Sequence, residues 1–266
     1  MLYQYFKVES GKDCLKDQLL KVSIPNRIND PFEFLPQYVK IQDLDIIKAQ
    51  ALEPDIAKML TNKFNKDNDF IASFGIISLD KWPSYVNNNI QSLYNFYNMS
   101  FEYAVASQFS NYLDDLSKEI GLICLTANKG SILMWSHYAN KHTGIVIGFN
   151  DKLFENKAVK VNYSETRVPV KVGFNIIDKN DFNQVLYTKS IDWKYEAEYR
   201  LCMKLNSCLQ KGYNYFIPFP IETIQEVYFG LNCNDNDISE IRSLLNNNAT
   251  ICKGKRNIYD YKIDFD

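Results

Sequence analysis

Two glutamates and an arginine alternate along the segment Lys194–Leu201. Because side chains of a β-strand point alternately to its two faces, a strand here would bring Glu196, Glu198 and Arg200 to one face. The two carboxylates would lie roughly 7 Å apart, so one pKa is expected to rise unless Arg200 or Lys189 compensates. Such a pair suits acid or base catalysis, or the stabilisation of a cation. A solvated outer face of a surface strand is the alternative.

Both histidines of the 266-residue chain, His137 and His142, lie within six positions of each other, beside Trp135 and Tyr138. Histidine titrates near neutral pH and often acts as a general acid or base, so we expect a local role for His137. The alternatives are structural histidines and aromatic residues that only pack in the core. A further hypothesis makes Cys124 a nucleophile with His137 as its base, although no spacing requires this pairing.

The elements that would position these residues follow from the apolar pattern. We expect, in order, a strand over Ile123–Thr126, a turn around Lys129–Gly130, a helix from Ser131 and a strand over Gly144–Phe149. Ser131 is a suitable N-cap for the helix. Trp135, Tyr138 and Ala139 recur at helical spacing on one face, and His137 lies off that face.

A turn is predicted at Asn29–Glu33, Asn-Asp-Pro-Phe-Glu, because the residue before a proline avoids the helical conformation. We expect Asn29 or Asp30 to accept hydrogen bonds from backbone amides of this turn. Phe32 and Phe34 are expected to pack against the core.

Helices and strands are expected in different parts of the chain. Residues 1–8 predict a first strand, and residues 37–120 predict a series of helices. The later strands are predicted at 121–126, 143–149, 157–164, 167–174, 198–205, 215–220 and 226–231, followed by a helix at 237–247 and a closing strand at 258–264. The expected fold is α+β, with a mostly antiparallel strand core in the C-terminal half. We expect residues 1–266 to form a single domain in which 37–120 is a helical insertion packed on the sheet.

The composition argues against several classes of protein. A net charge of -2 and a pI near 5.8 give no field that would attract nucleic acid, although a local basic patch is compatible with them. No apolar run approaches the roughly 20 residues of a membrane span, and the N-terminus lacks the pattern of a signal peptide. The six cysteines show no C-x-x-C spacing, so we expect reduced thiols, no metal site and a cytoplasmic protein. Glycine-rich nucleotide-binding motifs are also absent.

Several motifs together resemble those of the bacterial and phage-borne family of domain of unknown function 2971. They are the aromatic first strand at Leu2–Phe6, the turn at Asn29–Glu33, Cys124–Thr126, Met134–Ala139 with Gly144, Trp193–Arg200 and Phe229-Gly230. The resemblance leaves out residues 37–120. The family's Cys-Phe-Ser element is Cys-Leu-Thr here, which keeps a hydroxyl at Thr126 and loses an aromatic residue.

The order of elements also resembles that of ADP-ribosyltransferases, which implies a split sheet and NAD as a substrate. By this resemblance Glu198 is the catalytic carboxylate, assisted by Glu196. His137 is a further catalytic candidate because of its position beside Tyr138, and not because of the resemblance. The residues that the resemblance implies in NAD binding are Tyr5 in the pocket wall, Thr126 on the ribose, and Trp135 or Tyr138 against nicotinamide. Arg200, which adjoins the two glutamates, is a further candidate. A carboxylate beside developing positive charge stabilises it, and an aromatic face can stack on nicotinamide. The first strand, however, has no Arg or His at the position where the superfamily holds NAD.

The resemblance implies an ADP-ribosyltransferase-like effector that modifies a macromolecular target, either a protein or a nucleic acid. Its expected role is in phage defence or as a toxin. A defence-system protein is a further expected partner. Two alternatives stay open. One is a hydrolase or nuclease that uses His137 with Glu196 or Glu198, and the other is a non-catalytic sensor of a nucleotide or a phage protein. The Glu-x-Glu pair favours catalysis over sensing, and the lack of a metal-spaced cluster disfavours a nuclease.

Overall fold

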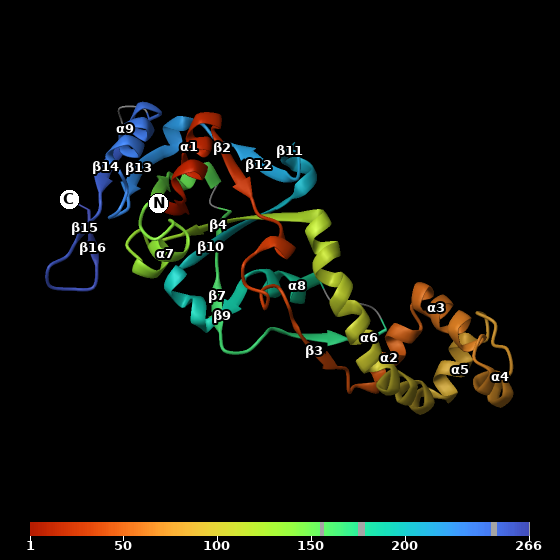
Figure 1. Ribbon diagram of the computed structural model, residues 1–266. Coiled ribbons are helices and arrows are strands. Elements are labelled where there is room, and N and C mark those ends of the chain that lie inside the picture. Colours follow the sequence, from red (N-terminus) through yellow and green to blue (C-terminus); the bar gives the residue numbers. More distant parts are fainter. Residues whose placement is uncertain (155–156, 175–178, 246–248, 266) are drawn as a thin grey trace. The chain divides into compact units, whose positions relative to one another are not determined.

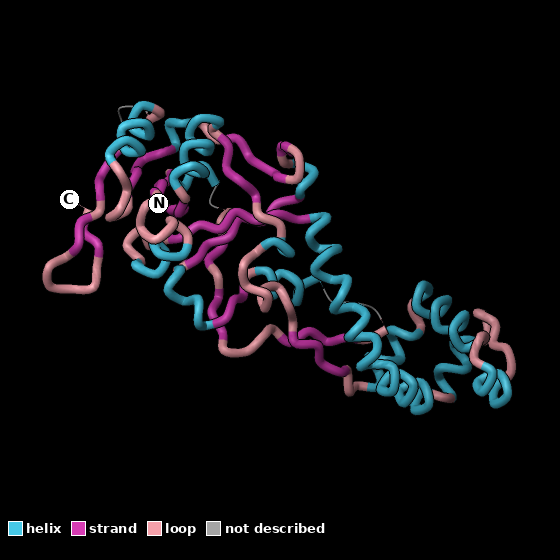
Figure 2. Tube along the Cα trace, viewed as in Figure 1, coloured by secondary structure: helices cyan, strands magenta, loops and turns pink. Residues whose placement is uncertain are grey.

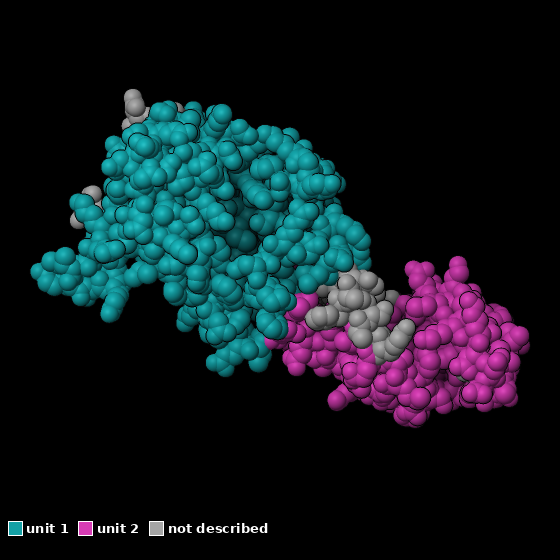
Figure 3. All heavy atoms as spheres, viewed as in Figure 1, with its two compact units in different colours: residues 1–34, 113–166, 187–266 teal, residues 35–112, 167–186 magenta. Residues whose placement is uncertain are grey.

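The computed structural model describes residues 1–154, 157–174, 179–245 and 249–265. The chain folds into two compact units, teal and magenta in Figure 3. Unit 1 consists of residues 1–34, 113–166 and 187–266, and unit 2 consists of residues 35–112 and 167–186. The expectation of a single domain, with residues 37–120 packed on its sheet, remains a prediction.

Unit 1 is built around a seven-stranded sheet with the order β14-β13-β5-β1-β4-β10-β6 (Figure 1). In that order the strands are Thr250–Lys253, Ile224–Phe229, Ile145–Phe149, Leu2–Phe6, Ile120–Thr126, Glu198–Lys204 and Val159–Lys160. Neighbouring strands are antiparallel, except that β13 and β14 are parallel. The predicted α+β class and mostly antiparallel core are therefore confirmed.

Smaller elements complete unit 1. The strands β2 (Leu19–Val22), β11 (Leu209–Lys211) and β12 (Asn214–Pro218) form one sheet, β7 (Asn162–Ser164) pairs with β9 (Thr188–Ser190), and β15 (Lys255–Arg256) pairs with β16 (Ile263–Asp264). The α-helices are α1 (Val8–Asp17), α7 (Ile132–His137) and α9 (Asp235–Ser243). The 3-10 helices are η1 (Pro25–Arg27), η2 (Asp151–Phe154), η3 (Ile191–Glu196), η4 (Leu205–Ser207) and η5 (Ile221–Thr223).

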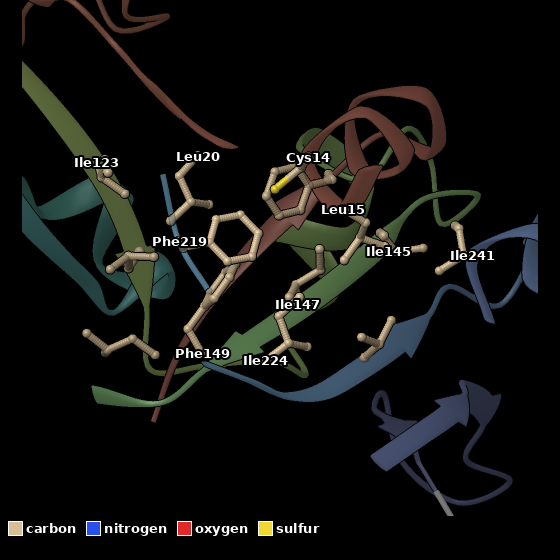
Figure 4. Close-up of a cluster of buried hydrophobic side chains, with 14 of the residues drawn as sticks. Cys14, Leu15, Leu20, Ile123, Ile145, Ile147, Phe149, Phe219, Ile224 and Ile241 are labelled. Atoms are coloured by element: carbon tan, nitrogen blue, oxygen red, sulfur yellow. The ribbon is translucent and has the colours of Figure 1, made fainter. Parts of the chain in front are cut away.

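One face of the large sheet carries an apolar core (Figure 4). Ile145, Ile147 and Phe149 alternate along β5 toward this face, and all three are fully buried. α1 covers them through Leu15, and α9 through Ile241. Burying a side chain of this kind contributes about 1.5–3 kcal/mol, so this core holds the sheet and both helices together.

α7 packs against part of the opposite face of the sheet. Ser131 caps this helix as predicted, because its hydroxyl accepts a hydrogen bond from the backbone N–H of Met134 at 3.3 Å. Trp135 and Ala139 are fully buried. The Trp135 ring meets the Tyr5 ring edge to face, with centroids 5.3 Å apart. The helix thereby fixes the position of Tyr5 in β1.

Two glycines of the sequence motifs permit a close approach between backbones. A Cβ atom at Gly144 would lie 2.1 Å from the carbonyl oxygen of Phe6, and one at Gly230 would lie 2.1 Å from that of His142. No side chain fits at such distances. These two motif positions therefore serve packing at the end of the sheet.

The strand predicted over Lys194–Leu201 is wrong in its first half. Residues 191–196 form η3, Ala197 has a left-handed φ of 45°, and β10 begins only at Glu198. The side chain of Ser190 starts η3 by accepting a hydrogen bond from a backbone N–H of its first turn. Such a local cap competes with strand pairing, and the alternation of polar and apolar residues does not reveal it.

Other differences from the prediction are local. α1 and β2 occupy residues to which no element was assigned, and β3 (Gln37–Lys40) is a strand where helices were expected to begin. β14 was also missed. Of the closing strand predicted at 258–264 only β16 forms, because the side chain of Asn257 accepts hydrogen bonds from Tyr259 and Asp260 and turns the chain.

Unit 2 is mostly helical (Figure 2). Its helices are α2 (Leu44–Ala51), α3 (Pro54–Phe64), α4 (Asn68–Phe74), α5 (Trp82–Asn88), α6 (Ile90–Glu119), of which residues up to 112 belong to this unit, and α8 (Lys179–Leu186). The strands β3 and β8 (Pro169–Val172) pair in parallel. Trp82 and Val86 are buried in its core. In the described ranges of the chain, no helix is both long enough and apolar enough to cross a bilayer.

Candidate active site

A cavity of about 470 Å³ lies in unit 1, lined in part by residues of β1, β4 and β10. Figure 3 shows a hollow in this unit, where Figure 1 shows β4 and β10 from the same viewpoint. The wall combines tyrosines, carboxylates and a lysine, namely Tyr3, Tyr5, Tyr138, Glu33, Glu196, Glu198 and Lys189. Sites for small ligands and cofactors commonly measure about 300–1,000 Å³. The cavity is therefore of the size of a ligand site.

The register of the strands brings polar side chains of three strands to one face. Glu198 of β10 pairs with Thr126 of β4. Arg200 pairs with Cys124 in the same ladder, and Tyr3 of β1 pairs with Thr126 from the other side. Cross-strand partners share a face, so these residues, far apart in sequence, lie next to one another.

From Glu198 onward, β10 alternates as predicted. Tyr199 and Leu201 pack against the apolar core, while Glu198 and Arg200 belong to the opposite face. This charged face is not solvated, since Glu198 is 4% exposed and Arg200 is 0% exposed. The alternative of a solvated surface strand is therefore wrong. Charges buried to this degree need partners within the protein.

Five charged side chains form one buried cluster, each at most 5% exposed: Glu33, Lys189, Glu196, Glu198 and Arg200. Nζ of Lys189 lies 2.7 Å from Glu196 Oε2 and 3.2 Å from Glu198 Oε2. It also lies 3.6 Å from Glu33 Oε2. Among these five side chains, three carboxylates and two cations give a formal excess of one negative charge. An adjacent positive charge would be stabilised by it.

Arg200 connects Glu198 with the turn that carries Glu33. Its guanidinium donates to Glu198 through Nε at 2.8 Å and through Nη2 at 3.0 Å, and Nη2 also donates to Glu33. The ring of Phe34 lies 4.9 Å from the guanidinium carbon. Arg200 is not among the residues that line the cavity. The structure therefore does not bring it to the surface where a cofactor was expected to bind.

Burial and neighbouring charges shift the ionisation of this cluster. Burial raises the pKa of Glu198 and Glu196 raises it further, while Lys189 lowers it. The rise predicted for one glutamate of the pair is thus found at Glu198. Burial alone would lower the pKa of Lys189, but Glu198 and Glu196 raise it overall. Burial lowers the pKa of Arg200 to about 10, which leaves it charged at neutral pH.

Glu196 is held in place by the cavity wall. Tyr138 donates to its Oε1 at 2.5 Å, and Asn29 donates to the Tyr138 hydroxyl at 3.4 Å. Burial and this carboxylate raise the pKa of Tyr138, so the hydroxyl remains a donor at neutral pH. Thr126 donates to the backbone carbonyl of Glu196 at 2.5 Å. The hydroxyl expected on a ribose therefore already uses its proton to hold η3.

The aromatic residues predicted to bind a cofactor separate into two groups. Tyr5 and Tyr138 line the cavity. The Tyr5 hydroxyl donates to the carbonyl of Asn128 at 2.8 Å, which fixes the ring. Trp135 is 0% exposed, donates to the carbonyl of Lys129 at 2.9 Å and does not line the cavity. Of the two residues proposed to stack on nicotinamide, only Tyr138 is at the cavity.

The two histidines have different surroundings. His137 lines the cavity together with Glu198, and its Nδ1 lies 3.2 Å from the Tyr195 hydroxyl. His142 stacks on Trp135, with ring centroids 6.2 Å apart and planes 11° apart, and is not part of the lining. As predicted, His137 and not His142 shares the cavity with Glu198.

Cys124 also lines the cavity, next to Glu198. Burial raises the pKa of the thiol well above its usual value, and the charge and hydrogen bond of Glu198 raise it further. The thiolate is the reactive form of cysteine. These surroundings therefore argue against Cys124 as a nucleophile.

We expect Cys124 in the folded protein to react with iodoacetamide at least about tenfold more slowly at about pH 8 than in the unfolded chain. Timed alkylation followed by mass spectrometry of the peptides would measure the rate, with the partly exposed Cys208 as an internal control. Equal rates in the folded and unfolded chains would show that Cys124 is reactive after all.

The Asn-Asp-Pro-Phe-Glu turn contributes the third carboxylate. Asp30 Oδ1 accepts a hydrogen bond from the backbone N–H of Phe32 at 2.9 Å, as predicted for this turn. Phe34 is 2% exposed but Phe32 is 66% exposed, so the expected packing is right for Phe34 and wrong for Phe32. Glu33 lies between them and accepts from Arg200.

Replacing Phe34 by leucine should lower the free energy of unfolding by about 1–2 kcal/mol, because packing volume and the contact with Arg200 are both lost. Phe32→Leu is the matched control and should change it by less than about 0.5 kcal/mol. Urea denaturation of both variants measures the difference. Equal effects would mean that the turn is not anchored through Phe34.

Sequence reasoning did not assign Glu33 to the site and considered Lys189 only as a compensating charge. Glu33 and Arg200 are 167 positions apart, and no local pattern relates them. The available signal was the presence of Glu33 in a recognisable turn motif. Across the described residues, no group of three or more His, Cys, Asp or Glu side chains has an arrangement that could hold a metal ion.

Residues 134–201 match the model of a family described as "Protein of unknown function (DUF2971)". This supports the resemblance drawn from the motifs, over a stretch that includes Tyr138, Lys189, Glu196, Glu198 and Arg200. No curated protein and no solved structure matches the chain significantly.

Proposed function

We propose that this protein is an ADP-ribosyltransferase-like enzyme that uses NAD to modify a macromolecule, in defence against phages or as a toxin. One observation carries the proposal: Glu196, Glu198 and His137 line a single cavity whose wall also contains Tyr5 and Tyr138. Carboxylates that adjoin aromatic rings in one cavity suit a ligand that has a planar ring and develops positive charge.

In the proposed reaction, the bond between C1′ of the ribose and the nicotinamide nitrogen breaks, and the nitrogen keeps the electron pair. The ribose then acquires oxocarbenium character, which the excess negative charge of the cluster stabilises. A nucleophilic atom of the acceptor forms the new bond to C1′. Its proton goes to His137, which is exposed in the cavity wall.

The glutamates have different tasks in this reaction. Glu198 is fixed by Arg200 and Lys189, so its carboxylate is oriented before substrate binds. Glu196 is fixed by Tyr138 and Lys189. We assign the stabilisation of positive charge to Glu198 and the positioning of the ribose to Glu196. Tyr138 and Tyr5 provide the aromatic wall for nicotinamide.

One observation favours a second candidate, a sensor that binds a nucleotide without cleaving it. Both oxygens of Glu198 accept from Arg200, and Lys189 donates to Oε2 as well. Carboxylates neutralised in this way stabilise an added positive charge less than free ones. The two candidates differ in whether NAD is consumed.

The test is to incubate the purified protein with a cell extract and NAD labelled in its adenine. We expect the label to move to the macromolecular fraction, and digestion with a protease or a nuclease then identifies the acceptor. Glu222→Gln, at an exposed glutamate of the same unit, is the matched control and should transfer label at the wild-type rate. Label that remains on intact NAD would favour the sensor, and free labelled ADP-ribose would indicate a hydrolase.

A further inference from the structure

The cavity is electrically asymmetric. Its buried end holds the cluster with an excess of one carboxylate, formed by Glu33, Glu196 and Glu198 around Lys189 and Arg200. Among the described residues that line the cavity, two have cationic side chains, Lys189 and Arg27. An anion is repelled from the buried end, where Lys189 is already bound to the three glutamates.

Arg27 has a different environment. It is exposed, at the end of η1, and in the described part of the chain no carboxylate lies within ion-pair distance of it. Its Nη1 donates to the backbone carbonyl of Tyr213 at 2.7 Å, which orients the guanidinium and leaves other N–H donors available. An oriented arginine of this kind suits a phosphate group, which it can bind through two parallel hydrogen bonds.

Tyr213, whose backbone carbonyl accepts from this arginine, lies in a β-hairpin turn between β11 and β12. Lys211 pairs with Asn214, so Gly212 and Tyr213 form a two-residue hairpin turn, and Gly212 has the positive φ of 60° that such turns require. β12 also pairs with β2, the strand that leads to η1. Yet the Tyr213 side chain is 85% exposed and belongs to none of the hydrophobic clusters formed by the described residues. An exposed ring on a hairpin whose strands are paired in a three-stranded sheet is suited to stacking on a planar base.

We propose that Arg27, which lines the cavity, and Tyr213, which lies outside the lining but whose carbonyl Arg27 contacts, form a subsite that holds the diphosphate and the base of a nucleotide. Arg27 binds the phosphate and Tyr213 stacks on the base. The nucleotide is thereby oriented with its cationic end toward Glu196 and Glu198. This inference rests on the proposed function, since NAD carries a diphosphate, an adenine and a cationic nicotinamide, but the subsite itself needs only the first two.

The test is calorimetric titration of the full chain with ADP, adenosine and inorganic pyrophosphate, none of which contains nicotinamide. Arg27→Ala should weaken ADP and pyrophosphate binding by at least about tenfold and leave adenosine unchanged. Tyr213→Ala should weaken ADP and adenosine by about five- to 100-fold and leave pyrophosphate unchanged. The matched controls are Arg242→Ala and Tyr259→Ala, at an exposed arginine and an exposed tyrosine elsewhere in unit 1, and both should bind like the wild type.

Wild-type protein that does not bind ADP would overturn the subsite, and so would variants at Arg27 and Tyr213 that retain wild-type affinity for ADP. These outcomes do not depend on catalysis. Selective ADP binding without nicotinamide release would keep the subsite and reject the transferase. Nicotinamide release by the wild type, with a KM for NAD that is unchanged in both variants, would keep the transferase and reject the subsite.

Discussion

Glu198→Gln is expected to reduce the rate of nicotinamide release from NAD by about 100-fold or more, in line with the loss of one group that stabilises charge in a transition state. The amide keeps the shape of the side chain but carries no negative charge. Initial rates at saturating NAD, with Glu222→Gln as the control, measure the effect. A rate within twofold of the wild type would remove Glu198 from the mechanism.

The same variant has a pH signature in stability. Because the pKa of Glu198 is raised on folding, ionisation of this group disfavours the folded state. The carboxyl group of Glu198 makes its full contribution to the free energy of unfolding at pH values below the pKa of a glutamate in the unfolded chain. This contribution is lost as the pH rises through the pKa of Glu198 in the folded protein. Wild-type protein should therefore lose its advantage in melting temperature over Glu198→Gln as pH increases. An advantage that grows with pH would contradict the raised pKa.

Arg200→Met should have the largest effect on stability. Removing a guanidinium that is 0% exposed leaves Glu33 and Glu198 with Lys189 as the remaining cation of the cluster. Breaking a buried ion pair in this way costs about 3–5 kcal/mol, which corresponds to a fall of roughly 10 °C in melting temperature. Thermal unfolding followed by circular dichroism measures it.

A second variant separates charge from packing. Combining Arg200→Met with Glu33→Gln removes one of the uncompensated carboxylates, so the double variant should be more stable than Arg200→Met alone. Stability of Arg200→Met should also rise as pH falls, because the carboxyl groups become neutral. If the two substitutions lower the free energy of unfolding additively, and the stability of Arg200→Met does not rise at low pH, the arginine acts through its packing volume and not through its charge.

The sequence predicted the parts of the site that depend on local pattern. Apolar runs located β4 and β5, the spacing at Ser131 located α7, and alternation from Glu198 onward distinguished the charged face of β10 from its apolar face. Such patterns depend on few neighbouring residues, so they can be read from one chain.

The rest depends on contacts that are distant in sequence. Glu33 joins the site only because a turn near the N-terminus meets Arg200 across 167 positions. The indole ring of Trp135 is of a type that stacks on planar ligands, but it is buried against Tyr5 and therefore does not line the cavity. The turn at Ala197 is set by a cap and a left-handed residue, which a period-two pattern does not reveal.

The most direct measurement of the central claim is the time course of free nicotinamide when the purified wild-type chain is incubated with NAD alone. Water or a residue of the protein itself then replaces the macromolecular acceptor. We predict nicotinamide that accumulates in proportion to enzyme concentration and time, above a blank without protein. NAD that stays intact over the full course, although it binds to the protein, would contradict cleavage at Glu198 and leave the cavity as a binding site.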